Sequence, residues 1–109
     1  MFKLLQNPEF THTVKVQTPV NGGHATQTFQ ARFRVTGITD SDQHNTLTAE
    51  GTKVYLREIF VGWDGVTDDQ GEPVLFNDQT RDQMIDVPFV RVALLETYNS
   101  AMMGAKRGT

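Results

Sequence analysis

Apolar and polar residues alternate along two stretches near the N-terminus. The face predicted to be apolar carries Phe10, His12, Val14, Val16, Thr18 and Val20 in the first stretch and Phe29, Ala31, Phe33 and Val35 in the second. A period of two, with β-branched and aromatic residues, predicts two half-buried strands. Asn21-Gly22-Gly23 lies between them, and these residues tolerate the positive φ of a tight turn. The pattern therefore predicts an antiparallel β-hairpin.

Further along the chain the apolar spacing becomes helical. One helix face would carry Tyr55, Leu56, Ile59, Phe60 and Trp63. This spacing predicts a helix from Lys53 to about Val61, and the hydroxyl of Thr52 is suited to cap its first turn.

Two more helices are predicted after it. Asn77 or Asp78 caps a short helix that ends at Pro88. Proline is also well placed in the first turn of a helix, so the last helix is predicted from Pro88 to about Met103, where Gly104 closes it.

The regions between these elements are polar or rich in turn-forming residues. Residues 38–51 predict a loop with room for a helical turn after Asp40, and residues 62–73 predict a series of turns. A hairpin alone is marginally stable in water, so the helices should cover its apolar face. We therefore predict one α+β domain over residues 1–109, with the hairpin at about 10–37 and the helical part at about 52–103.

The last helix has two apolar faces. Its inward stripe would be Val90, Leu94, Tyr98 and Ala101, flanked by Leu95 and Met102. A second set, consisting of Phe89, Val92, Ala93 and Met103, lies away from that stripe. A helix that is apolar on more than one side is either buried on both sides or meets a partner.

Composition narrows the class of protein. The 109 residues include no cysteine, which excludes disulfides and thiolate metal sites, and no apolar run is long enough for a membrane span, so no membrane partner is expected. The net charge of −3 argues against a general electrostatic grip on nucleic acid. Arg32 and Arg34 alternate with Phe29 and Phe33, which puts charge and aromatic rings on opposite strand faces rather than on one nucleic-acid platform.

Charge is unevenly distributed along the chain. Between Phe10 and Gly37 the only charged residues are the basic Lys15, Arg32 and Arg34. Between Asp64 and Asp86 there are seven acidic residues and one arginine. Two interpretations stay open, namely a solvated acidic loop, or a weak homo-oligomer in which the basic hairpin face meets the acidic region.

No pattern of catalytic or metal-binding residues is evident. The three histidines, His12, His24 and His44, are scattered and lack the close spacing of a zinc motif. Setting Gly71 at the glycine position of a calcium loop puts Val66 first and Asn77 last, so the ligand register fails. Serine-nucleophile and phosphate-loop motifs are also missing. The sequence predicts a protein that is not an enzyme and has no cofactor and no metal site.

Two segments carry a family resemblance. The first runs from Leu56-Arg57-Glu58-Ile59-Phe60-Val61-Gly62-Trp63-Asp64-Gly65-Val66 to Asp69-Gln70-Gly71-Glu72-Pro73-Val74-Leu75-Phe76. The second is Ile85-Asp86-Val87-Pro88-Phe89-Val90-Arg91, followed by Ala93-Leu94 and Tyr98. Over roughly residues 52–103 the chain resembles the small tail assembly chaperones of long-tailed phages and prophages.

The resemblance implies a function. Such chaperones bind the long, apolar tape measure protein in the host cytoplasm and keep it soluble until the tail tube protein polymerises around it. The tape measure protein is therefore the expected partner, and the tail tube protein is a further candidate. Candidate partner-binding residues are Trp63, Phe89, Val92 and Met103. The alternative is a structural virion component, such as a tail or head-tail connector protein.

Overall fold

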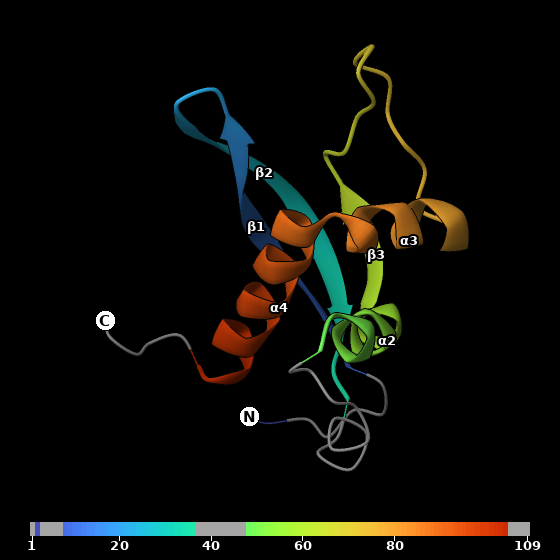
Figure 1. The fold of residues 1–109 in the computed structure, drawn as a ribbon. Coiled ribbons are helices and arrows are strands. Elements are labelled where there is room, and N and C mark those ends of the chain that lie inside the picture. The colour runs from blue at the N-terminus through green and yellow to red at the C-terminus, as the bar shows by residue number, and fades with distance from the viewer. Residues whose placement is uncertain (1, 3–7, 37–47, 105–109) are drawn as a thin grey trace.

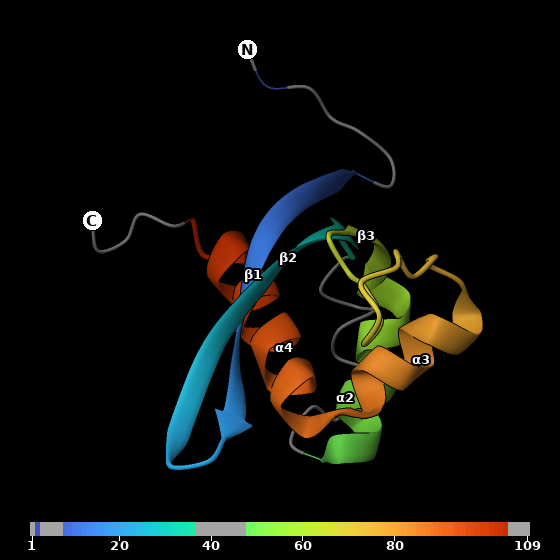
Figure 2. The ribbon, with the colours of Figure 1, turned by 90° about the horizontal axis from the view of Figure 1, so that it is seen from above.

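The computed structural model describes residues 2, 8–36 and 48–104. Its elements are β1 (Glu9–Val20), β2 (Gly23–Arg34), α2 (Ala49–Ile59), β3 (Phe60–Asp64), α3 (Asp78–Asp86) and α4 (Pro88–Met102). The strands form one antiparallel sheet in the order β1-β2-β3, and the described helices lie on one of its faces (Figure 1, Figure 2). The predicted α+β class, with an N-terminal antiparallel hairpin packed against C-terminal helices, is confirmed.

The hairpin has the register that its alternation predicts. Val20 pairs with Gly23 across a two-residue turn, in which Gly22 has a φ of +81° that side chains with a Cβ rarely adopt. Twelve residues of each strand are paired, and Phe10 lies opposite Phe33. Both strands therefore present their apolar residues to the same side of the sheet.

Burial along the hairpin is less extensive than the alternation predicts. Val14 and Val16 are buried, but His12 and Val20 are exposed. The helices cover the middle of the hairpin and its tip projects beyond them, as Figure 1 shows. β2 ends at Arg34 rather than at about residue 37.

The helix α2 begins earlier than predicted. Its N-cap is Thr48, whose hydroxyl accepts the N–H of Gly51 at 3.0 Å. Thr52, the predicted cap, is instead a buried residue inside the first turn, and its Oγ1 donates to the carbonyl of Thr48 at 2.9 Å. The predicted start at Lys53 is therefore wrong, and so is the loop prediction for residues 48–51; a helical turn after Asp40 would lie outside the described residues.

The strand β3 was not predicted. The three-residue spacing of Phe60 and Trp63 predicts a helix, but α2 ends at Ile59 and both residues belong to β3. Arg32 pairs with Gly62 and Phe33 pairs with Phe60, so Val61 is an extra residue that forms a β-bulge. A bulge puts residues three apart on the same face of a strand, which imitates helical spacing.

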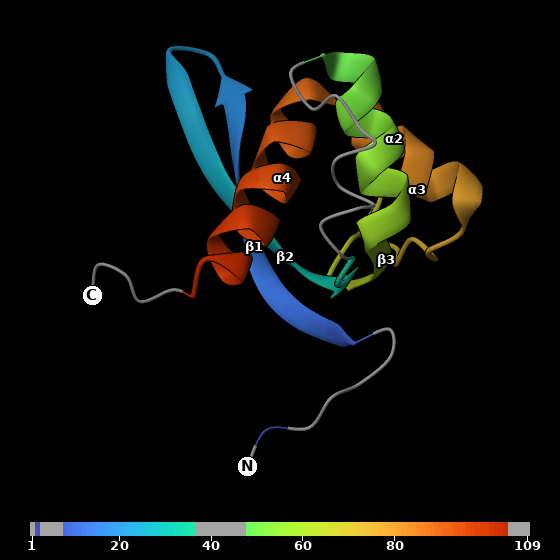
Figure 3. The ribbon, with the colours of Figure 1, turned by 90° about the horizontal axis from the view of Figure 1, so that it is seen from below.

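The two C-terminal helices are confirmed. Asn77 caps α3 by accepting the N–H of Thr80 at 2.9 Å, and the Thr80 hydroxyl accepts the N–H of Asn77 at 3.0 Å, which completes a capping box. Pro88 occupies the first turn of α4, which ends at Met102, and Gly104 follows with a φ of +68°. Figure 3 shows α2, α3 and α4 grouped on the same side of the sheet.

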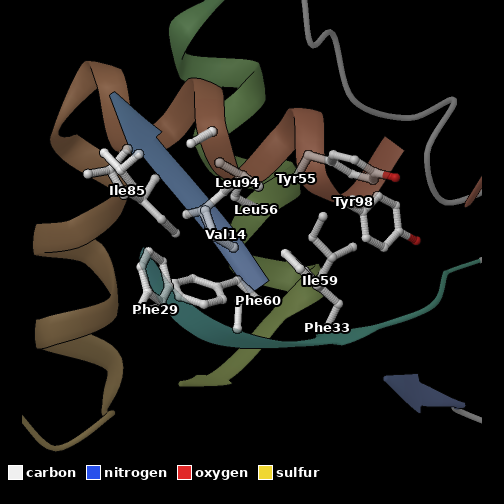
Figure 4. Packing of buried hydrophobic residues seen from close by; sticks show 14 residues of the cluster. Val14, Phe29, Phe33, Tyr55, Leu56, Ile59, Phe60, Ile85, Leu94 and Tyr98 are labelled. Carbon is white, nitrogen blue, oxygen red and sulfur yellow. The ribbon is translucent and has the colours of Figure 1, made fainter. Parts of the chain in front are cut away.

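Aromatic and branched side chains from all six of the described elements form one core (Figure 4). Its largest fully buried members are Phe33, Phe60, Leu56, Ile59, Ile85, Leu94 and Val14. Phe29 and Phe33 thus point inward, which confirms that the aromatic rings of β2 belong to the core rather than to an exposed stacking surface. The sheet supplies one layer of this core and the helices supply the other.

Tyr55 should ionise unusually late. Burial, together with the neighbouring Tyr98, raises the pKa of Tyr55 to about 12 from its ordinary value of 10.0. The folded chain therefore keeps this proton at pH values where the unfolded chain has lost it. The resulting stabilisation is complete below pH 10 and is lost as the pH rises toward 12. Spectrophotometric titration of the native chain should show a late tyrosinate step that is missing in Tyr55→Phe.

Candidate partner-binding surface

Trp63 has a structural position on β3. Its indole Nε1–H donates to the carbonyl of Val74 at 2.8 Å, and its ring meets Phe76 edge-on with centroids 4.9 Å apart. The side chain is only partly exposed. Trp63 therefore joins the end of β3 to the returning arm of the loop between β3 and α3, in agreement with the amphipathic character of tryptophan.

Removing the indole N–H should loosen that loop. Trp63→Phe keeps an aromatic ring but leaves the Val74 carbonyl without its donor. We expect the free energy of unfolding to fall by about 1 kcal/mol, which is the usual net contribution of one hydrogen bond to stability. Amide hydrogen exchange should rise in residues 66–76 more than in α4. Equal exchange in the two regions would mean that Trp63 does not hold the loop.

Of the other three candidate residues, Phe89 and Val92 lie on the outward face of α4, and Met103 is the C-cap of that helix. Val92 is 55% exposed, Met103 is 71% exposed and Phe89 is 36% exposed, which makes Phe89 the least exposed of the three. Phe89 and Val92 are one helical turn apart and form a small apolar patch. Met103 is at the far end, about 20 Å away along the axis, with the exposed polar residues Glu96 and Ser100 between. The structure therefore brings two of the four candidates together.

The division of α4 into two faces is correct in part. Val90, Leu94 and Tyr98 are buried as predicted. Ala93, which the sequence predicts to be in the outward set, is also buried. Met102, which is predicted to flank the inward stripe, is 44% exposed. The reason is that α4 packs against β1 as well as against α2 and α3, so its buried arc extends toward the hairpin.

A groove opens beside Phe89, at the N-terminal end of α4. Its volume is about 460 Å³, and it lies between the hairpin, the start of the loop after β3 and the junction of α3 with α4. The apolar part of its lining consists of Val16, Phe29, Val66, Met84, Val87, Phe89 and Val90. Thr18, Gln27, Thr28 and Thr67 supply polar groups. The arrangement, with apolar walls and neutral polar groups, suits an apolar segment of a partner better than an ion or a charged substrate.

Sequence reasoning missed two features of this surface. The groove depends on contacts between distant segments, and no local pattern predicts it. Leu75 is 79% exposed beside Phe76, which packs inward against Trp63. The sequence does contain a signal for this exposed residue, because Leu75 and Phe76 are adjacent apolar residues after a turn-rich stretch. In an extended segment only one of two adjacent side chains can face the core.

Several residues of the two segments that carry the resemblance have structural roles. An added Cβ at Gly62 would lie 3.0 Å from the guanidinium of Arg32, and Gly65 has a φ of +83°. Arg91 donates to the carbonyl of Ile85 at 3.0 Å and thereby caps α3. Phe89 and Leu75 are the apolar residues of these segments that stay exposed.

Ion pairs within the chain reduce the charge that is available for the predicted contact between the basic hairpin face and the acidic region 64–86. Lys53 contacts Asp86 at 3.1 Å, Arg57 contacts Asp82 at 3.3 Å, and Arg81 contacts both Asp78 and Asp82. Three of the seven acidic residues are therefore paired internally. On the hairpin, Arg34 donates to the carbonyl of Glu58 at 2.9 Å and so is not presented to a partner. Charge-driven self-association through these regions stays a prediction.

The acidic loop satisfies its own polar groups. The carboxylate of Asp68 accepts the N–H of Gln70 at 2.9 Å and that of Glu72 at 3.0 Å. Within the described ranges, no three His, Asp or Glu side chains gather in a way that could hold a metal ion. In the same part of the chain, no helix has the length and apolar character needed to cross a membrane.

Comparison with protein-family models, curated proteins and solved structures finds no match for this chain.

Proposed function

We propose that this protein is a phage tail assembly chaperone that binds the tape measure protein in the host cytoplasm and keeps it soluble. The observation that carries the proposal is the exposed pair Phe89 and Val92, of which Phe89 lines a largely apolar groove. An amphipathic helix binds by laying its apolar face into such a groove, with side chains at helical spacing as anchors. The resemblance of residues 52–103 to tail assembly chaperones supports the same conclusion.

The size of the surface fits a transient binder. The groove, at about 460 Å³, and the adjacent patch offer a small contact area, which gives a modest affinity for each copy. Many copies along a long tape measure protein would nevertheless cover it, because each apolar segment offers a separate site. Modest affinity also allows the copies to leave when tube protein polymerises. The tail tube protein would then displace the chaperone rather than bind it permanently.

Co-expression with the tape measure protein encoded in the same genome tests the proposal. The native chain should move the tape measure protein from the insoluble to the soluble fraction, and Phe89→Ser and Val92→Ser should weaken that effect. Asn99→Ala is the matched control, because Asn99 is an exposed polar residue on the same helix. If the native chain leaves the tape measure protein as insoluble as it is when expressed alone, the chaperone function is wrong.

A structural role in the virion is the second candidate, and the long strand β1 favours it. Within the described residues β1 pairs only with β2, so one edge of a 12-residue strand is open. Structural subunits can join by adding a strand to such an edge. Mass spectrometry of purified particles separates the two roles. A tail or connector protein is present in fixed proportion, whereas a chaperone is absent from mature particles.

A further inference from the structure

The backbone of β1 shows which of its residues face the open edge. Val35 N–H donates to the carbonyl of Pro8 at 2.9 Å, next to the first register pair of the hairpin. Hydrogen-bonded pairs alternate along an antiparallel ladder, so even-numbered residues of β1 bond to β2 and odd-numbered residues point their backbone groups outward. Pro19 agrees with this pattern, since its missing N–H falls on the open side, where proline is tolerated.

The side chains of the outward-bonding residues carry two opposite charges. Glu9 and Lys15 are both exposed and lie three residues before and three residues after His12. If two copies of β1 pair antiparallel with His12 on the two-fold axis, Glu9 of each copy lies opposite Lys15 of the other, and Thr11 lies opposite Thr13. The backbone groups of these residues are the ones that are free to form the ladder. Glu9 also contacts Arg32 of its own chain at 4.0 Å, at an exposed position where its carboxylate can meet Lys15 of the other copy as well. Charge thus favours this register over the alternatives.

The exposed face of α4 has the same symmetry. Phe89 and Met103 lie seven residues before and seven residues after Glu96. Glu96 and His12 line a common groove of about 400 Å³ between α4 and β1. The helix runs antiparallel to β1, because Phe89 lies near Val16 whereas Tyr98 stacks on Phe10 with centroids 6.1 Å apart.

We propose that a second copy of this chain binds the open edge of β1, antiparallel and centred on His12. The two sheets then form one six-stranded sheet, and the two α4 helices lie side by side across the axis. In this arrangement Phe89 of one copy faces Met103 of the other and their exposed side chains cover each other, so dimerisation would compete with a partner that binds at Phe89. One two-fold axis satisfies both sets of pairs, namely Glu9 with Lys15 between the β1 strands and Phe89 with Met103 between the α4 helices. This agreement carries the proposal. It does not rest on the proposed chaperone function.

Charge reversal tests the register. In sedimentation analysis the native chain should have twice its monomer mass of 12.2 kDa. Glu9→Lys or Lys15→Glu alone turns both opposite-charge pairs into like-charge pairs and should weaken dimerisation by about tenfold. The double variant Glu9→Lys/Lys15→Glu restores both pairs and should recover the dimer. Circular dichroism establishes that each variant is folded.

Cysteine cross-linking gives a second readout, because the native chain has no cysteine. Residues on the axis of an antiparallel pair have Cα atoms about 4.5 Å apart, within disulfide range. His12→Cys should therefore form a disulfide-linked dimer on mild oxidation, while Gln17→Cys, away from the axis, should not. The proposal is wrong if the native chain is a monomer at every concentration, if folded single charge variants dimerise like the native chain, or if Gln17→Cys cross-links as well as His12→Cys. Solubilisation of the tape measure protein is scored separately, so either proposal can fail alone.

Discussion

Replacing Phe60 with alanine should lower the free energy of unfolding by about 3–5 kcal/mol. Phe60 is fully buried. The centroid of its ring lies 5.5–6.4 Å from the ring centroids of Phe29, Phe33, Trp63 and Phe76. The substitution leaves a cavity where the sheet, α2 and the loop after β3 meet. For a domain whose total stability is about 5–15 kcal/mol, this is a large fraction. Chemical denaturation followed by circular dichroism measures it.

Phe2→Ala is the matched control, because Phe2 loses the same side chain from a position that is 86% exposed. It should change the free energy of unfolding by no more than about 0.5 kcal/mol. If Phe60→Ala costs no more than Phe2→Ala, the cluster of rings around β3 is not the centre of the core.

Leu94→Ala should cost about 2–5 kcal/mol, whereas polar substitutions on the outer face of α4 should cost much less. Leu94 is fully buried and belongs to the core cluster. Val92→Ser, on the same helix, changes a residue that is largely exposed, and Phe89→Ser changes one at the mouth of the groove. Thermal and chemical denaturation of the three variants separate the two faces.

The comparison also tests the binding surface. Phe89→Ser and Val92→Ser should remain folded while they weaken solubilisation of the tape measure protein. If Phe89→Ser destabilises the chain as severely as Leu94→Ala, then both faces of α4 are core. In that case the partner must bind elsewhere, and the exposed Leu75 on the loop is the next position to test.

The hairpin and the last two helices could be predicted because each carries a local signal. Alternation defines the strands, Gly22 supplies the positive φ of the turn, and Asn77 and Pro88 mark helix starts. The strand β3 could not be predicted in the same way. The extra residue Val61 breaks its alternation, so its inward residues have the spacing of a helix.

The candidate surface could be predicted only in part, because burial depends on neighbours that periodicity does not reveal. Phe89 and Val92 are on the exposed side as predicted, but β1 covers Ala93. Trp63 contributes a hydrogen bond to the loop, and this role depends on Val74, which is 11 residues away in the chain. The groove arises from segments that meet only in the folded chain.

The hydrogen bonds of Asp68 have a consequence for the rate and strength of binding. By holding the backbone of Gln70 and Glu72, this carboxylate fixes the tip of the loop between β3 and α3 before any partner arrives. The base of that loop is held by Val74 N–H, which donates to the carbonyl of Val66 at 2.9 Å. One wall of the groove is thus ordered before a ligand binds. Binding therefore does not include the loss of backbone conformational entropy that ordering this loop would otherwise require. Asp68→Ala should therefore reduce partner affinity through a slower association rate, although Asp68 itself lies outside the groove.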